Sequence, residues 1–161
     1  YMNNKYGKYG WATGNLLTFV IGQGDILVTP IQVGQMMNLI ASRGNTHIPS
    51  LHINNSSNEF NLPLKSATWN FLQDAIWNVV NHKNGTGKLA KIEGADIYGK
   101  TGTAQNPHGE DHSWFAGYME IEDNPIISLS VLVEHGGKGS IKGAIISRKI
   151  FEFIVQNELI Q

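Results

Sequence analysis

The sequence has 161 residues, of which 41% are apolar and 16% are charged, and its net charge is −1 at pH 7. This composition fits one folded domain, and it excludes intrinsic disorder and the basic surface that nucleic acid requires, so no nucleic-acid partner is expected. The absence of cysteine excludes disulfides, thiolate catalysis and zinc–cysteine sites.

The start of the chain, residues 1–14, is rich in tyrosine and glycine and shows no helix-cap or strand signal. The first residue is Tyr1 rather than Met, and no signal-peptide pattern follows it. No apolar run approaches the ~20 residues that a membrane-spanning helix needs. We therefore expect this chain to begin inside a larger protein.

Two helices are predicted in the first half of the chain. The first begins at Thr29-Pro30, because threonine can cap a helix and proline suits its first turn, and it ends by Gly44. Ser66 is predicted to cap the second helix, which closes at Gly85. The polar stretch 54–59 is expected to be a surface loop between them. The apolar stripes are Ile31, Met36, Met37, Leu39 and Ile40 in the first helix, and Trp69, Leu72, Ile76, Val79 and Val80 in the second.

Three strands and a helix are predicted in the second half. The strands run over Asp96–Ala104, His112–Ile121 and Ile126–His135, with a turn at Asp123–Pro125 that makes the last two antiparallel. A final amphipathic helix is predicted from about Ala144. Its expected apolar face consists of Ile146, Ile150, Phe153 and Ile154. This order of elements predicts an α+β fold, with helices packed on an antiparallel sheet.

The most informative motif is the run Gly99–Ala104, which places Lys100, Gly102 and two threonines in one short extended segment. A strand of this kind at the edge of a sheet can pair with an extended peptide by main-chain hydrogen bonds. Gly102 lets another backbone approach closely, and the lysine and threonine side chains can hold a carboxylate. The triplet Lys-Thr-Gly is one signature of penicillin-interacting serine enzymes, although a solvated polar strand end would look the same.

An overlapping pattern points to a different function. Gly94–Thr101 fits the phosphate-loop pattern G-x-x-x-x-G-K-[ST], and the later run Ile126–Val133 could imitate the second strand of a nucleotide hydrolase. A phosphate loop must follow a buried strand and open a helix. Here the preceding residues Lys88–Glu93 are largely charged, and the following residues Gly102–Gly109 show no helical stripe. The nucleotide hydrolase is therefore kept only as a distant alternative.

His108 and His112 lie four residues apart, as two metal ligands on one helix face would. Pro107 and Gly109 argue against a helix there, while the two acidic residues between the histidines would suit a metal-binding loop. The favoured interpretation is a loop beside the active site, with no metal and no cofactor expected.

Several sequence blocks occur here in the order found in one family. They resemble segments of class B penicillin-binding proteins, and together they extend from about Trp11 to Phe151. Lys100–Gln105 and the residues after it resemble the penicillin-binding protein 2 branch, which serves cell elongation, although His135 departs from the usual asparagine. The blocks are Ile21–Gly24, Val28–Gln32, Asn84–Gly87, Lys100–Gln105, Asn106–Gly109, Asp111–Phe115 and Glu134–Gly139.

The resemblance implies a role for each residue of the strand motif. Lys100 is expected to line the active site, where it tunes the proton network and attracts the substrate carboxylate. Thr101 and Thr103 are expected to hydrogen-bond the substrate or a penicillin. The amide of Thr103 would supply half of the oxyanion hole. Gly102 would keep the strand open to the substrate backbone.

The implied activity is that of a D,D-transpeptidase, in which a serine takes an acyl group from one stem peptide and passes it to the amine of another. No serine in this chain has a lysine three positions later, so the family's nucleophile motif Ser-x-x-Lys is absent. Ser56–Asn58 fits the second motif, Ser-x-Asn, by letter, but it stands on the wrong side of Ile21–Gly24 in the chain order. Residues 1–161 are therefore expected to be the C-terminal portion of one transpeptidase domain, inactive alone, with both motifs upstream.

The resemblance also implies an architecture and a setting. The expected fold is part of the helix/antiparallel-sheet/helix sandwich of penicillin-binding proteins and serine β-lactamases, with five strands in the full sheet. The expected ligands are peptidoglycan stem peptides and β-lactams, and the expected partner is a glycan-polymerising membrane protein. The expected location is the periplasmic side of the inner membrane, with an anchor upstream of this chain. A β-lactamase, a penicillin-sensor domain and a non-catalytic binding module remain alternatives.

Overall fold

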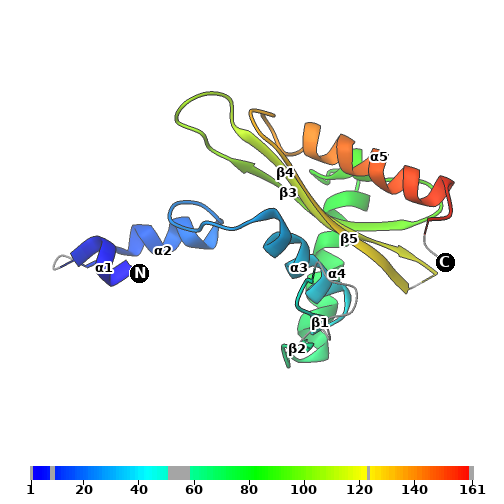
Figure 1. The fold of residues 1–161 in the computed structure, drawn as a ribbon, viewed down its shortest axis with the longest axis horizontal. Helices are drawn as coiled ribbons and strands as arrows, with labels where there is room; N and C mark the ends of the chain where they lie inside the picture. Colours follow the sequence, from blue (N-terminus) through cyan, green and yellow to red (C-terminus); the bar gives the residue numbers. More distant parts are fainter. Residues whose placement is uncertain (1, 8–9, 51–58, 123, 160–161) are drawn as a thin grey trace.

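The computed structural model describes residues 2–7, 10–50, 59–122 and 124–159 (Figure 1). In the part of the chain that it describes, no helix combines the length and the apolar character that crossing a membrane requires. The helices and strands, in chain order, are α1 Met2–Tyr6, α2 Thr13–Val20, α3 Pro30–Ala41, β1 Asn45–His47, β2 Glu59–Asn61, α4 Ser66–Asn81, the short 3₁₀ helix η2 Lys88–Ala90, β3 Asp96–Ala104, β4 His112–Ile121, β5 Asn124–Val133 and α5 Lys142–Gln156.

The main sheet consists of β3, β4 and β5 in that order, with antiparallel pairing throughout. The predicted bounds of β3 and β4 are confirmed. β5 begins and ends two residues earlier than predicted, because Asn124 pairs with Ile121 and because His135 has a φ of 52°, which extended backbone does not adopt. The predicted turn is thus partly wrong, since Asn124 and Pro125 belong to β5, and Asp123 lies outside the described residues.

Helices cover both faces of this sheet, so the predicted α+β architecture is confirmed. α5 lies along one face, and α3 packs on β5 and β4 from the opposite face (Figure 1). α4 packs beside β3 at one edge of the sheet. The alternation of side chains along the strands therefore divides them into a set that faces α5 and a set that faces α3.

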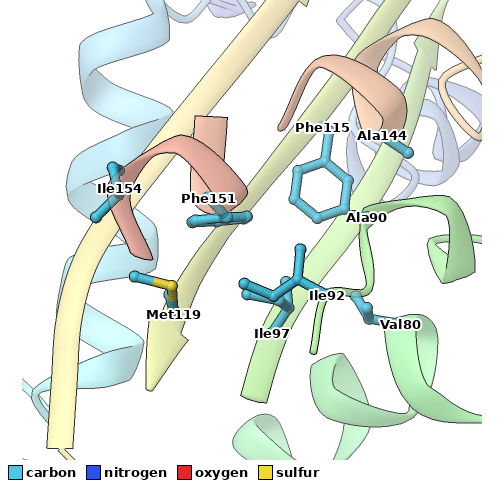
Figure 2. Close-up of a cluster of buried hydrophobic side chains, with 9 residues drawn as sticks. All are labelled: Val80, Ala90, Ile92, Ile97, Phe115, Met119, Ala144, Phe151 and Ile154. Atoms are coloured by element: carbon cyan, nitrogen blue, oxygen red, sulfur yellow. The ribbon is translucent and has the colours of Figure 1, made fainter. Parts of the chain in front are cut away.

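The hydrophobic core lies between the sheet and α5 (Figure 2). Phe115 from β4 and Phe151 from α5 are both fully buried, and Ile97 of β3 is buried beside them. The C-terminal end of α4 and the residues near η2 close this core at the β3 edge. Its members are Val80, Ala90, Ile92, Ile97, Phe115, Met119, Ala144, Phe151 and Ile154.

The buried face of α5 differs from the predicted one. Ile154 is buried as predicted, but Phe153 is 58% exposed, and Ile146 and Ile150 are also exposed. The buried residues of the helix are Gly143, Ala144, Ser147, Phe151 and Ile154. Small residues set this face: a Cβ on Gly143 would lie 2.9 Å from the carbonyl carbon of Trp114, so the helix approaches β4 closely there. Hydrophobic periodicity favoured the larger side chains and missed this close packing.

The predicted start of α3 is confirmed in detail, whereas that of α4 is not. Thr29 is the N-cap of α3: its side chain accepts a hydrogen bond from the Gln32 amide, and the Gln32 side chain accepts one from the Thr29 amide. Gly44, predicted to end this helix, has a φ of 97°. Ser66 is the first residue of α4 rather than its cap, and the cap position, Lys65, makes no side-chain hydrogen bond.

The expected loop at 54–59 falls mostly outside the described residues. Its last residue, Glu59, is the exception, because it begins β2 and pairs with His47 of β1. The apolar stripe predicted for α4 is confirmed at Trp69 and Val80, both of which are buried.

Candidate functional site

β3 carries the Lys100–Ala104 motif along the edge of the sheet. Among the described strands β3 pairs only with β4, so its other edge has no strand partner. Lys100 is exposed, and its Nζ donates a hydrogen bond to the carbonyl oxygen of Thr101 at 2.7 Å. The lysine ammonium thus lies beside the main chain of its own strand.

The main chain of Thr103 is accessible from outside the sheet. Its carbonyl oxygen accepts a hydrogen bond from Nε2 of Gln23 at 2.9 Å. The carbonyl oxygen of Thr101 also accepts a hydrogen bond from a side chain, that of Lys100. Because Thr101 lies two residues before Thr103 in the strand, the two carbonyls point to the same side of β3. In an antiparallel strand the N–H and C=O of one residue point to the same side, so we infer that the Thr103 amide also faces the open edge.

The two threonine hydroxyls of the motif have protein partners. Thr101 is 9% exposed, and its Oγ1 lies 3.0 Å from Oγ1 of Thr86. Oγ1 of Thr103 accepts a hydrogen bond from the Gly139 amide at 3.1 Å. These bonds fix the side chains of β3 against the turn after α4 and the connection before α5. That both hydroxyls contact a ligand stays a prediction.

Gly102 and Gly139 allow the connection before α5 to lie directly against β3. A Cβ on Gly139 would lie 1.8 Å from the carbonyl oxygen of Gly102, which is far inside van der Waals contact. A Cβ on Gly102 would lie 3.2 Å from Cβ of Trp114 on β4. Both positions therefore have a packing reason to be glycine, which adds to the expected access of a substrate backbone at Gly102.

A cleft of about 450 Å³ runs along this part of β3. Its walls come from Lys100–Ala104 on one side and from α3 and the segment before it on the other. The lining is mostly apolar, and Lys100 is its one charged residue among the described residues. A single positive charge in an apolar cleft favours an anionic group such as a carboxylate. The large apolar and aromatic lining residues are Ile21, Ile26, Leu27, Val28, Val33, Met36, Met37 and Trp114.

The histidines near the motif form polar contacts with their neighbours. The His135 amide donates to Nδ1 of His112 at 3.0 Å, and Nδ1 of His135 lies 3.2 Å from Nδ2 of Asn106. His108 belongs to the turn before β4. Within the described residues no group of three or more histidines and carboxylates could hold a metal ion. The left-handed φ of His135 gives a physical reason for the usual asparagine there, because asparagine and histidine both tolerate that conformation.

The phosphate-loop alternative is wrong for this chain. Residues 99–101 lie in the middle of β3, and Gly102–Ala104 continue the same strand. The next described element after β3 is the strand β4, not a helix, so no helix N-terminus directly follows Lys100 to hold a phosphate.

Three contacts of the site were not predicted as such from the sequence. Thr86, Gln23 and Gly139 all lie in blocks that carry the family resemblance, but no contact with β3 was predicted for them. Each reaches β3 from far along the chain, over 15, 80 and 36 residues respectively. The signal that could have identified them was their position between or beside glycines, which marks close backbone approach.

Comparisons with known proteins agree with this geometry. Residues 2–153 match the family described as the penicillin binding protein transpeptidase domain. The chain is 31% identical to the peptidoglycan D,D-transpeptidase MrdA of Haemophilus influenzae over 182 aligned positions, which cover 96% of this chain and 28% of that protein. It therefore spans less than a third of the length of this curated relative.

Two solved structures share the fold over nearly the whole chain. Penicillin-binding protein 2 of Helicobacter pylori has a TM-score of 0.78 and 32% identity, over 94% of this chain and 29% of that one. Penicillin-binding protein 2 of Pseudomonas aeruginosa, solved in complex with WCK 5153, has a TM-score of 0.77 and 26% identity, over 95% of this chain and 35% of that one. The chain belongs to the penicillin-binding protein transpeptidase family, within its penicillin-binding protein 2 (MrdA) branch.

Proposed function

We propose that this chain is the part of a peptidoglycan D,D-transpeptidase that holds the acyl donor. The observation that carries the proposal is the position of Lys100–Thr103 on the free edge of β3, within a chain that matches the transpeptidase family over residues 2–153. An extended stem peptide would add as a strand to this edge, with its carboxylate toward Lys100.

The proposed reaction is acyl transfer in two steps. A serine from outside these 161 residues attacks the carbonyl carbon between the two terminal D-alanines, the C–N bond breaks, and D-alanine leaves with the proton on its amine. The amine of a second stem peptide then attacks the ester, the serine oxygen recovers its proton, and the new amide is the cross-link. The Thr103 amide would donate to the oxyanion of each tetrahedral intermediate, together with the amide of the serine. A β-lactam would enter by the first step and remain as a stable acyl-enzyme.

The same proposal covers the setting of the protein. We infer a periplasmic site of action on the inner membrane, with stem peptides as substrates and a glycan-polymerising membrane protein as the partner in elongation. The support for it is the membership in the penicillin-binding protein 2 branch and the name of the Haemophilus relative, a peptidoglycan transpeptidase. Relatives with this name favour a transpeptidase over a β-lactamase or a sensor domain.

The direct test is the intact mass of the full-length protein after incubation with benzylpenicillin. We expect one penicilloyl adduct that persists, because the acyl-enzyme of a transpeptidase is hydrolysed slowly. Lys100→Ala should slow acylation by about 10²-fold or more, since it removes the cation of the cleft and part of the proton network. The matched control is Lys149→Ala, an exposed lysine on α5, which should acylate at the wild-type rate.

Three outcomes would contradict the proposal. An adduct that is lost rapidly with turnover would indicate a β-lactamase instead. Equal effects of the two lysine substitutions would remove Lys100 from the site. An adduct on the 161 residues alone would show that a serine of this chain is the nucleophile, against the absence of a Ser-x-x-Lys motif.

A further inference from the structure

The side chain of Gln23 occupies a main-chain acceptor of the proposed substrate-binding edge. Its Nε2 donates to the carbonyl oxygen of Thr103 at 2.9 Å, across 80 residues of sequence. The same oxygen lies on the open side of β3, where a strand added to the edge would place one of its own N–H groups. A side-chain amide has the same donor chemistry as a peptide N–H, so Gln23 imitates that part of a bound peptide.

The backbone around Gln23 is shaped to present this side chain. Gly22 and Gly24 both adopt left-handed conformations, with φ of 72° and 76°. The amides of Gly22 and Gln23 donate to the carbonyls of Phe19 and Thr18, each at 2.9 Å, so the turn is tied to the end of α2. A Cβ on Gly24 would lie 3.1 Å from Oγ1 of Thr18, which adds crowding to the strain of its positive φ. The Gln23 side chain is half-buried in the same cleft as Lys100.

The main-chain groups of a free strand edge need partners, because an unpaired edge recruits other strands. The two outward carbonyls identified on β3 each have a side-chain donor: the Lys100 ammonium reaches Thr101, and the Gln23 amide reaches Thr103. The lysine belongs to the strand itself and has a separate role in the proposed reaction. Gln23 comes from outside the sheet, so its contact can be exchanged without disturbing the β3–β4 ladder.

We propose that Gln23 is an exchangeable cap of the β3 edge, which hydrogen-bonds the Thr103 carbonyl in the free enzyme and gives way to an amide N–H of the acyl donor. This inference rests on the proposed function, since it assumes that the donor pairs with β3. A donor with an N–H at that position replaces the Gln23 bond with its own. A donor that lacks the N–H leaves the Gln23 hydrogen bond in place, so removing the Gln23 side chain should not change how fast that donor reacts. Gln23 is therefore a positioning residue that sets how strongly an amide-bearing donor is favoured.

Two penicillins separate these cases in the full-length protein. Benzylpenicillin carries an acylamino group, with its N–H, on the ring carbon next to the lactam carbonyl. Penicillanic acid has the same fused rings, but this carbon carries only hydrogen. We expect Gln23→Ala to accelerate acylation by benzylpenicillin about two- to tenfold, the value of one exchanged hydrogen bond, and to leave penicillanic acid unchanged. Gln23→Glu, which keeps the length of the side chain but removes its donor, should shift the ratio of the two rates in the same direction.

The controls distinguish this proposal from the one that it rests on. Gln35→Ala removes a glutamine from the middle of α3 that lines a groove beside β5 instead of the cleft along β3, and it should change neither rate. An equal change in both rates, or a slower reaction of Gln23→Ala with benzylpenicillin, would show that Gln23 only holds its segment in place, and it would overturn the exchange. Failure of both reagents to acylate the wild-type protein would instead overturn the proposed function.

Discussion

Two regions of the molecule use apolar side chains in opposite ways. One is the sheet packed against α5, and the other is the N-terminal segment Thr13–Val28. Phe115 and Phe151 are fully buried between the sheet and α5, whereas Val20 is 78% exposed and Leu27 is 88% exposed. In Figure 1, α1 and α2 extend away from the body formed by the sheet and its helices. The first region is therefore held by packing within the described residues, and the second presents apolar surface to its surroundings.

This difference shows which contacts hold each region in place. The strands β3, β4 and β5 and the core beneath them all come from one continuous stretch of the chain, from Val80 to Ile154. The segment before α3 reaches β3 from far along the chain, through the hydrogen bond of Gln23 to Thr103. Extended exposed apolar surface is typical of regions that meet another surface, and this segment forms one wall of the proposed substrate cleft.

The largest expected contrast comes from truncating one apolar side chain in each region. Phe151→Ala should lower the free energy of unfolding by about 3–5 kcal/mol, because it opens a cavity in a fully buried core. Leu17→Ala removes a side chain that is 65% exposed and should change it by less than about 0.5 kcal/mol. Urea denaturation of the transpeptidase domain would measure both. Similar losses in the two variants would mean that the N-terminal segment is as firmly packed as the sheet.

A second contrast of opposite sign comes from two glycines. Gly139→Ala should destabilise the domain by about 1–3 kcal/mol, because its Cβ would lie 1.8 Å from the Gly102 carbonyl oxygen and would push the connection away from β3. Gly14→Ala in α2 meets no atom within 4 Å and should stabilise that helix by up to about 1 kcal/mol. In thermal unfolding, the Tm should fall for Gly139→Ala and should stay unchanged or rise for Gly14→Ala. A neutral Gly139→Ala would be evidence against the close approach to β3.

The smallest effect concerns a titration in the N-terminal segment. The Lys5 ammonium, followed by the Tyr6 hydroxyl, lowers the pKa of Asp25 below its usual 3.8. Because the folded pKa is depressed, the contact stabilises the segment above pH 3.8 and is lost as the pH falls through the lower, folded value. NMR titration of the Asp25 carboxyl should show this, and Lys5→Met should raise the pKa toward 3.8.

The matched control for that titration is Arg148→Met, which removes the ion pair with Glu152 on α5 and should leave the Asp25 titration unchanged. An Asp25 pKa that does not respond to Lys5→Met would contradict the contact between Lys5 of α1 and Asp25 in the turn after α2. Added salt should weaken the response, since the pair is exposed.

Much of the fold was predictable because its signals are local. The bounds of β3 and β4 follow from polarity patterns and flanking turns, and the start of α3 follows from the adjacent Thr29 and Pro30. The buried face of α5 was not predictable from periodicity, because Gly143 and Ser147 face the sheet for reasons of close approach that hydrophobicity does not encode. Ser66 failed as a cap because several residue types fit a helix start and the sequence does not fix which of them caps it.

By itself, the sequence determined the Lys100–Thr103 motif, the order of the strands around it and the resemblance to one family, since each depends on residue types at fixed short spacings. The tertiary structure decided that the motif lies on an edge of β3 with no partner among the described strands, that Thr101 and Thr103 contact Thr86 and Gly139, and that Gln23 reaches the Thr103 carbonyl. The physical reason is that hydrogen bonds across 15 to 80 residues depend on how whole elements pack, and no local pattern records which distant donor a strand carbonyl will meet.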